Sequence, residues 1–156
     1  FEKIAGYADD AALLADIDSV VATCCAIKAR IVEQDEFDTG LRMLLNFGHT
    51  LGHAVEQHFG YSCFTHGEGV AIGMYQLTKR TEELGMTAKG SAERIKSVLE
   101  KYNLPLTAGV EKAQLLDTMA RDKKKNGNSI TLIILQQIGE GVLQKVDWQE
   151  VPKYLG

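Results

Sequence analysis

The sequence predicts an all-α, multihelical domain that ends in a short pair of β-strands. Between residues 8 and 124, apolar residues recur at spacings of three and four, as on the buried face of a helix. The segment 129–139 is instead rich in β-branched residues and short enough for a strand, and 141–148 can pair with it. The chain has 156 residues, of which 45% are hydrophobic, so it can form one domain with its own core but not two ordinary domains.

Composition excludes several classes of protein. The net charge of −4 argues against a nucleic acid or an anionic membrane as the main partner. No apolar run approaches the roughly 20 residues of a membrane span, and there is no signal peptide. Cys24, Cys25 and Cys63 suit neither a disulfide framework nor a zinc-binding CxxC motif. We therefore expect a cytoplasmic protein with reduced thiols. Because the chain opens on Phe1 and runs at once into helix-like sequence, we also expect it to be a piece of a longer protein.

A long amphipathic helix is expected from Ala8 to about Glu36, beginning near one of two adjacent aspartates. Its apolar stripe contains Lys28. A lysine in that position either packs its stem and reaches water with its amine, or is a functional cation aimed into a site. An acidic, turn-prone link over residues 35–40 follows this helix.

The next expected helix, 41–60, carries a polar stripe. Polar residues at steps of four, three, four and three fall within an arc of roughly 80°, and they are Arg42, Asn46, His49, His53 and Glu56. The opposite face is apolar and includes two glycines, 48 and 52, where a neighbouring helix can come close. A guanidinium, an amide, two imidazoles and a carboxylate are groups that bind metals and oxyanions.

Further helices are expected over 68–84, 91–102 and 112–124, and a last short helix over 148–155. His66 lies just ahead of the first of these, which begins with small residues and should therefore pack closely against another helix or approach a ligand. The third ends in a basic run, 121–125. Its cations either complement the helix dipole or hold a phosphate.

The spacing of His49 and His53 allows both to reach one metal ion from a single helix face, but no Glu follows the first His as in the HExxH motif. Two histidines on a helix are more often structural or solvated than ligands. Neighbouring Arg42 and Asn46 favour a metal site, because they suit a phosphorylated or polyhydroxylated substrate beside the metal. A third ligand must come from elsewhere, and the candidates are His66, Glu56, Glu68 and His58.

Two blocks of sequence resemble the C-terminal domain of the 3-dehydroquinate synthase family. They are IKARIVEQDEFDTGLRMLLNFGHTLGHAVE at 27–56 and HGEGVAIGM at 66–74, and RDKK at 121–124 before a strand ending in IG adds to them. The resemblance covers nearly the whole chain from the first long helix onward. It implies that residues 1–156 form the helical, metal- and substrate-binding half of a two-domain enzyme, whose N-terminal NAD-binding α/β domain is absent from this chain.

The resemblance also implies roles for the histidines. His49 and His66 are the expected ligands of a divalent zinc or cobalt ion, whereas His53 is expected to contact substrate and handle a proton without binding the metal. This assignment replaces the pairing of His49 with His53 that spacing alone favours. The family's third ligand is a Glu in an EVIK-like motif upstream of this domain.

For the substrate, the resemblance implies that Lys28, Arg42 and Asn46 act with His53 as catalytic groups that hold phosphate, carboxylate and hydroxyls. Leu45 and a lysine of the basic run, Lys124 or its neighbour Lys123, are expected to contact the substrate as well. Asp38 stands where relatives tend to have Glu, which shortens a carboxylate near the site.

The implied reaction converts 3-deoxy-D-arabino-heptulosonate 7-phosphate to 3-dehydroquinate and phosphate in the shikimate pathway. In that family NAD transiently oxidises one hydroxyl, and zinc polarises its oxygen. The expected partners are this sugar-acid phosphate and the N-terminal domain, with a homodimer as a candidate assembly. One alternative is a sister sugar-phosphate cyclase such as 2-deoxy-scyllo-inosose synthase. Another is a non-catalytic helical module that binds a metal or phosphate.

Overall fold

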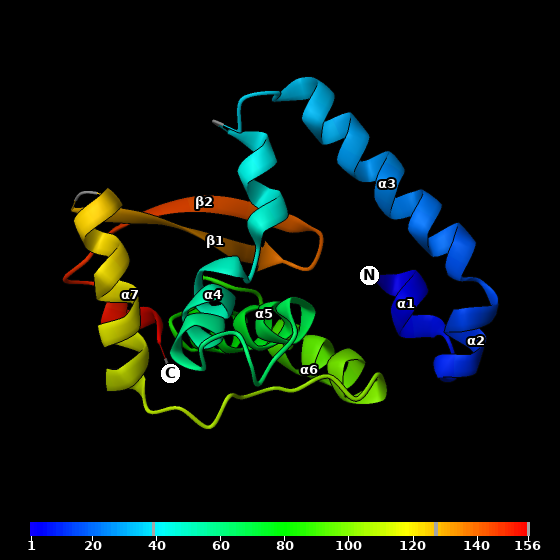
Figure 1. Ribbon diagram of the computed structural model, residues 1–156. Helices are drawn as coiled ribbons and strands as arrows, with labels where there is room; N and C mark the ends of the chain where they lie inside the picture. Colours follow the sequence, from blue (N-terminus) through cyan, green and yellow to red (C-terminus); the bar gives the residue numbers. More distant parts are fainter. Residues whose placement is uncertain (39, 127, 156) are drawn as a thin grey trace.

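Helices make up most of the structure, and a β-hairpin follows them near the C-terminus, as the sequence predicts (Figure 1). The computed structural model describes residues 1–38, 40–126 and 128–155, with the side chains of 121–126 outside that description. The α-helices are α1 (Glu2–Gly6), α2 (Asp10–Ala15), α3 (Ile17–Gln34), α4 (His49–His58), α5 (His66–Glu83), α6 (Ser91–Lys101) and α7 (Lys112–Asn126). The 3-10 helices η1 (Leu41–Asn46) and η2 (Val151–Tyr154) and the strands β1 (Ser129–Gln137) and β2 (Glu140–Asp147) complete the described part.

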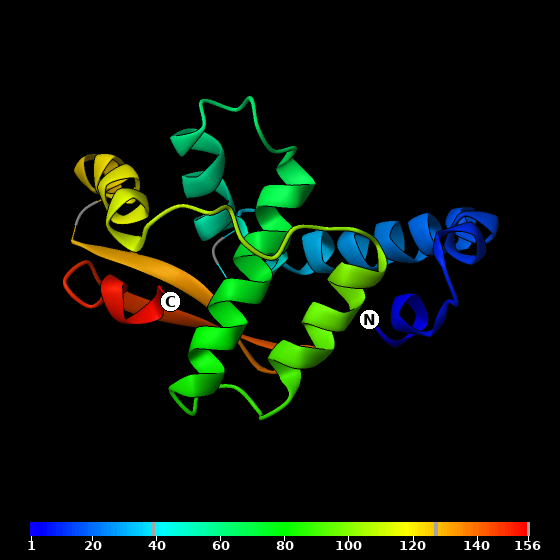
Figure 2. The same ribbon diagram turned by 90° about the horizontal axis from the view of Figure 1, so that it is seen from below.

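The hydrophobic core lies where α4, α5 and α7 meet the hairpin. The two strands are antiparallel, with Ser129 opposite Asp147 and Leu135 opposite Gly141. Both strands, the three helices and the C-terminal segment supply buried side chains, which are Leu51, Ala54, Leu77, Met119, Leu132, Ile134, Val146, Val151 and Leu155. Helix α6 adds a smaller cluster against α5 (Figure 2). This core fixes the position of α4 and α5, the helices that carry the histidines.

The close approach expected at the glycines is present between α4 and α5. A Cβ atom on Gly73 would lie 2.1 Å from the carbonyl oxygen of Gly48, and one on Gly52 would lie 2.9 Å from the carbonyl oxygen of Gly69. Both distances are far below a van der Waals contact, so the two helix backbones touch at these positions. This contact sets the distance between the first turns of α4 and α5.

The single helix predicted over 41–60 is wrong, because the chain breaks it into η1 and α4. Gly48 lies in the left-handed region at φ +84, which ends one helix and starts the next. Its carbonyl oxygen is also the atom that packs against Gly73. The residue that breaks the helix is therefore also a contact point between α4 and α5. The break turns Arg42 and Asn46 away from the straight stripe that a continuous helix would form.

The long helix predicted from residue 8 to 36 is also divided. Asp9 caps α2 by accepting a hydrogen bond from the N–H of Ala12 (2.8 Å), as the expected start implies. The chain then leaves helical geometry at Asp16 (φ −116, ψ 18) before α3 begins. The Asp16 carboxylate accepts hydrogen bonds from the hydroxyl of Tyr7 (2.5 Å) and the ammonium of Lys3 (2.8 Å), which tie the break to α1.

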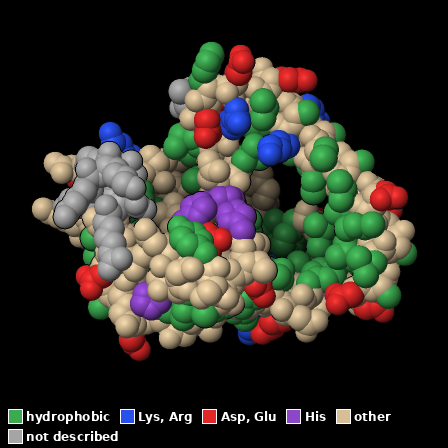
Figure 3. Space-filling model, viewed as in Figure 1, with side chains coloured by type: hydrophobic (Ala, Val, Ile, Leu, Met, Phe, Trp, Pro, Cys, Tyr) green, Lys and Arg blue, Asp and Glu red, His purple; other side chains and the backbone are tan. Residues whose placement is uncertain are grey.

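The N-terminal helices form an arm that stands away from the core. At one end Lys101 of α6 donates to the carbonyl oxygens of Ala5 (2.6 Å) and Tyr7 (2.9 Å), and at the other end α3 meets η1. Between these attachments the apolar stripe of the arm, expected to be buried, is largely exposed: Val21 is 52% and Ile27 is 43% accessible. The reason is that both attachments hold the arm off the core, across the hollow seen in Figure 3. No helix in residues 1–38, 40–126 and 128–155 is long and apolar enough to cross a membrane.

Helix α5 begins at His66, earlier than the predicted 68, because Thr65 caps it. The Thr65 hydroxyl accepts from the N–H of Glu68, and the Glu68 carboxylate accepts from the Thr65 N–H at 2.8 Å. This reciprocal cap fixes the first residue of α5. The predicted helices over 91–102 and 112–124 and the strand pair are confirmed close to their expected bounds. The last predicted helix is shorter, a 3-10 turn over Val151–Tyr154.

Glu82 is expected to stabilise the fold by about 1 kcal/mol, because it caps a helix other than its own. Its carboxylate accepts the N–H groups of Gly90 and Ala92 at the start of α6, both at 2.8 Å. These donors favour the charged form and lower the pKa of Glu82 below its ordinary 4.5. The Glu82→Ala variant should therefore lose stability at neutral pH, as measured by urea denaturation.

The pH dependence of this loss has a defined sign. Because the folded pKa is the lower one, the stabilisation is complete above about 4.5 and is lost as the pH falls through the folded pKa. Wild type and Glu82→Ala should thus converge in acid. The control is Glu83→Ala, which removes a surface carboxylate that pairs with Arg80 and should cost less than about 0.5 kcal/mol. Equal losses in the two variants would contradict the capping role.

Candidate functional site

Three histidines converge where α4 and α5 begin. His49 is the first residue of α4, His53 follows one turn later, and His66 is the first residue of α5. Their ring centroids are 5.0 Å apart for His49 and His66, 5.4 Å for His53 and His66, and 5.6 Å for His49 and His53. We call these three residues the histidine cluster. The glycine contact between the helices brings His66 across from the other two, and Figure 3 shows histidine side chains gathered beside the hollow.

Each ring of the histidine cluster uses its Nδ1 atom for an internal hydrogen bond. Nδ1 of His53 lies 2.8 Å from Oε2 of Glu56, and Nδ1 of His66 lies 3.1 Å from Oε1 of the same carboxylate. Nδ1 of His49 lies 3.4 Å from the carbonyl oxygen of Phe47. Oxygen atoms of these kinds only accept, so the hydrogen of each neutral ring belongs on Nδ1 and the Nε2 lone pair is free.

This arrangement fits a divalent metal with nitrogen ligands. Zinc and cobalt bind neutral imidazole, and a ligating histidine commonly donates its other ring N–H to a carboxylate or a backbone carbonyl. The His53 and His66 side chains are each 56% exposed, whereas that of Glu56 is 6% exposed. The pKa of His49 is lowered from 6.5, chiefly because partial burial disfavours the charged ring, and the nearby His66 and His53 act in the same direction. His49 is therefore uncharged at neutral pH, the form that binds metals.

The residues that could ligate a metal within this chain are not limited to the pair implied by the resemblance. One nitrogen or oxygen atom from each of His53, Glu56 and His66 lies within 4.8 Å of the others. Two of the other candidates for a third ligand have different partners: Glu68 caps α5, and the ring of His58 contacts Phe59 at a centroid distance of 5.0 Å. Among these candidates, Glu56 is thus the carboxylate that reaches the histidine cluster.

A cavity of about 410 Å³ adjoins His49 and contains most of the expected substrate residues. We call it the cationic cavity, because Lys28 of α3 and Arg42 of η1 line it together. Its other lining residues are Cys24, Asp38, Leu45, Asn46 and His49. Although the predicted stripe is broken, η1 still directs Arg42, Leu45 and Asn46 to one space. Lys28 lines this cavity, and its role as a functional cation stays a prediction.

The turn before η1 is held by side chains that the sequence did not single out for the site. The Asp35 carboxylate accepts from the backbone N–H groups of Gly40 (2.8 Å) and Arg42 (3.0 Å). The guanidinium of Arg42 donates to the carbonyl oxygen of Glu36 (2.7 Å). Asp38, in this same turn, has φ 55, a left-handed conformation that Asp tolerates better than most residues. These contacts place the Arg42 side chain at the cationic cavity.

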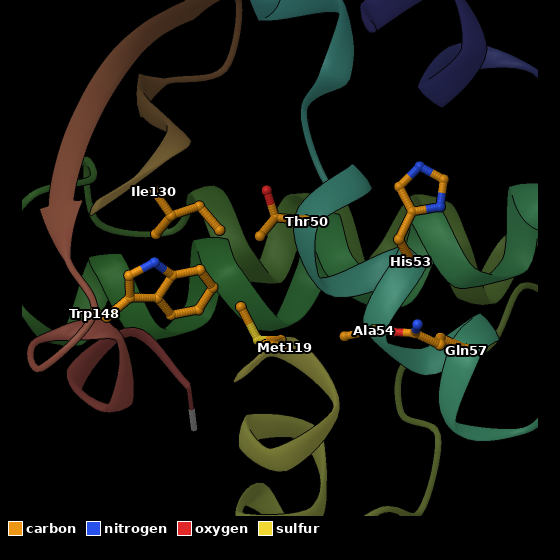
Figure 4. Close-up of a pocket in the computed structure, with 7 residues that line it drawn as sticks. All are labelled: Thr50, His53, Ala54, Gln57, Met119, Ile130 and Trp148. Carbon is orange, nitrogen blue, oxygen red and sulfur yellow. The ribbon is translucent and has the colours of Figure 1, made fainter. Parts of the chain in front are cut away.

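A second cavity, of about 240 Å³, is lined in part by His53 of α4 (Figure 4). Its apolar side chains, Met119, Ile130 and Trp148, gather at one end, and His53 stands at the other. His49 and His53 thus line different cavities, with the histidine cluster between them. The expected phosphate contact at Lys123 or Lys124 lies outside the described side chains.

Solved structures of two synthases share the fold of this chain. A solved structure of 2-deoxy-scyllo-inosose synthase complexed with carbaglucose-6-phosphate, NAD+ and Co2+ matches with a TM-score of 0.73 and 19% identity, over 89% of this chain and 40% of that chain. A solved structure of 2-epi-5-epi-valiolone synthase from Streptomyces hygroscopicus, with NAD+ and Zn2+ bound, matches with a TM-score of 0.69 and 20% identity, over 92% and 39% of the two chains. The fold is that of the helical domain of sugar-phosphate cyclases.

Sequence comparison identifies the family. A family model described as 3-dehydroquinate synthase C-terminal matches residues 3–125. The 3-dehydroquinate synthase of Clostridium acetobutylicum is 45% identical over 156 residues, which are 99% of this chain and 44% of that protein. The chain belongs to the 3-dehydroquinate synthase family, as its sequence blocks predict, and it spans less than half the length of this relative.

Proposed function

We propose that this chain is the metal- and substrate-binding C-terminal half of a 3-dehydroquinate synthase. The protein would convert 3-deoxy-D-arabino-heptulosonate 7-phosphate to 3-dehydroquinate and phosphate. The observation that carries this proposal is the convergence of three imidazoles, each with a free Nε2, beside a cavity lined by Lys28, Arg42 and Asn46. The 45% identity to a protein named for this activity supports it over the sister cyclases, whose likeness is in fold.

In this proposal His49 and His66 hold the metal, and a third ligand comes from an N-terminal half. When bound, a divalent ion such as zinc or cobalt supplies Lewis acidity toward the hydroxyl that is oxidised, and NAD supplies the hydride acceptor. Support for both groups comes from the structural relatives, which contain NAD+ with Co2+ or Zn2+. Support for an N-terminal half comes from the length of the relatives.

The side chains of this chain have separate proposed tasks. Arg42 and Lys28 bind the anionic groups of the substrate, because a guanidinium pairs with carboxylate or phosphate in two parallel hydrogen bonds and an ammonium acts as a point charge. Asn46 can donate to and accept from a hydroxyl. His53 accepts a substrate proton at Nε2, since its Nδ1 already bonds to Glu56. The free, exposed cysteines at 24, 25 and 63 fit the proposed cytoplasmic location.

Activity of a two-domain fusion tests the proposed function. The fusion joins this chain to the N-terminal half of the Clostridium acetobutylicum relative. With NAD and zinc it should release phosphate from 3-deoxy-D-arabino-heptulosonate 7-phosphate, as measured by a phosphate assay with chromatography of the product. It should not turn over glucose 6-phosphate. Turnover of the hexose phosphate instead would favour a sister cyclase, and stoichiometric zinc without turnover of either sugar would favour a non-catalytic module.

A further inference from the structure

We propose that Glu56 is a positioning residue that sets the tautomer of two histidines at once. It would keep the ring hydrogens of His53 and His66 on Nδ1 and so present Nε2 of both rings to the site. What the two rings then do rests on the proposed function. The placement of the hydrogens concerns this chain alone, and it can be measured without metal, substrate or NAD.

Each oxygen of the Glu56 carboxylate contacts a different histidine ring. Oε2 of Glu56 lies 2.8 Å from Nδ1 of His53, a residue of the same helix, and Oε1 lies 3.1 Å from Nδ1 of His66, on α5. Because an ionised carboxylate can only accept, both neutral rings must donate from Nδ1. One side chain therefore determines the chemical form of two residues on different helices.

Packing holds the Glu56 carboxylate in this position. The residue is 5% exposed, and its neighbours on α4, Ala54 and Val55, are buried in the protein interior. Across the helix crossing, a Cβ atom on Gly69 would lie 3.2 Å from Cγ of Glu56, so the glycine leaves the space that the Glu56 stem fills. The carboxylate cannot swing outward without losing this packing. The side chains of His53 and His66, by contrast, are each 56% exposed to solvent.

This contrast in exposure favours an indirect role for Glu56 over direct metal ligation. Both carboxylate oxygens already accept hydrogen bonds, and they contact Nδ1 of each ring and leave Nε2 to other partners. In protein metal sites a carboxylate behind a ligating histidine orients the ring and raises its basicity. Glu56 would do this for His66 and would also leave Nε2 of His53 ready to accept a proton.

Nitrogen-15 NMR of the metal-free chain tests the proposal directly. Long-range proton–nitrogen correlation spectra at a pH of about 8 distinguish a neutral ring that carries its hydrogen on Nδ1 from one that carries it on Nε2. We expect the Nδ1–H form for both His53 and His66. The ring of His58, which contacts Phe59, serves as an internal reference. A predominant Nε2–H form at either His53 or His66 would overturn the proposal.

The Glu56→Gln variant adds a second measurement. An amide has one acceptor oxygen, and its NH2 group only donates, so it can satisfy Nδ1–H of only one ring. We expect the other ring to switch to the Nε2–H form, and zinc affinity, measured by competition with a chromophoric chelator, to fall about 10- to 100-fold. Glu68→Gln is the matched control: it removes a carboxylate near His66 that caps α5 without touching the rings, so tautomers and affinity should stay unchanged. Wild-type tautomers and wild-type affinity in Glu56→Gln would overturn the proposal.

Zinc titration of wild-type chain separates this proposal from the proposed function. Coordination of zinc by Nε2 of His66, with the Nδ1 hydrogen retained, would support both. Coordination by Nδ1 would show Glu56 to be a fellow ligand and would overturn the positioning role. The expected tautomers, with no zinc bound even by the two-domain fusion, would support the role of Glu56 and contradict the proposed metal function.

Discussion

Replacing Gly73 by alanine is expected to destabilise the chain strongly. The new Cβ would lie 2.1 Å from the carbonyl oxygen of Gly48 and 3.0 Å from the backbone nitrogen of Gly52. Overpacking usually costs about 1–3 kcal/mol because side chains can yield. Here the obstacle is the backbone of α4, so we expect a loss of more than about 3 kcal/mol from a total of about 5–15 kcal/mol for a typical domain. Urea denaturation followed by circular dichroism measures this loss.

Gly67 provides the matched control on the same helix. A Cβ atom there would meet nothing within 4 Å, and alanine is the better helix former. Gly67→Ala should therefore be neutral or stabilising by up to about 1 kcal/mol. If Gly73→Ala proved as stable as Gly67→Ala, the backbone contact between α4 and α5 would not exist as described.

Removing the histidines one at a time from the two-domain fusion should separate metal binding from proton transfer. His49→Ala and His66→Ala are expected to lose zinc and phosphate release together, because the proposal makes these residues two of three protein ligands. His53→Ala should keep stoichiometric zinc and lose turnover by a factor of about 10² to 10⁴, the usual contribution of a general acid or base. Metal analysis of the purified variants measures zinc content, and the phosphate assay measures turnover.

The control for this series is His58→Ala, which removes the remaining histidine of α4, in contact with Phe59 and separate from the histidine cluster. It should retain zinc and turnover. Loss of zinc from His53→Ala would instead favour ligation by His53, Glu56 and His66, the group whose atoms lie within 4.8 Å of one another. It would also favour the pairing of His49 with His53 as ligands, which their helical spacing allows.

The sequence determined the fold class, the amphipathic segments and the identity of the groups at the site. Apolar spacing was enough to locate α6 and α7, because these helices bury one face. The hairpin was located by its short, β-branched segment. The glycines of the histidine segment indicated a close helix approach, and the structure has it. The sequence blocks also predicted the family, because the residues of a site recur at fixed places in the chain.

Only the tertiary structure decided how these groups meet. Local periodicity assumes that a helix continues, whereas Gly48 takes a left-handed conformation because α5 packs on its carbonyl oxygen, and the predicted stripe is divided there. The exposed stripe of α3 follows from how the arm is attached, at η1 and at α6, and α6 is far away in sequence. Glu56 was visible as a polar residue on a helix. That its carboxylate lies between His53 and His66 depends on the crossing of two helices, a long-range contact that no local pattern contains.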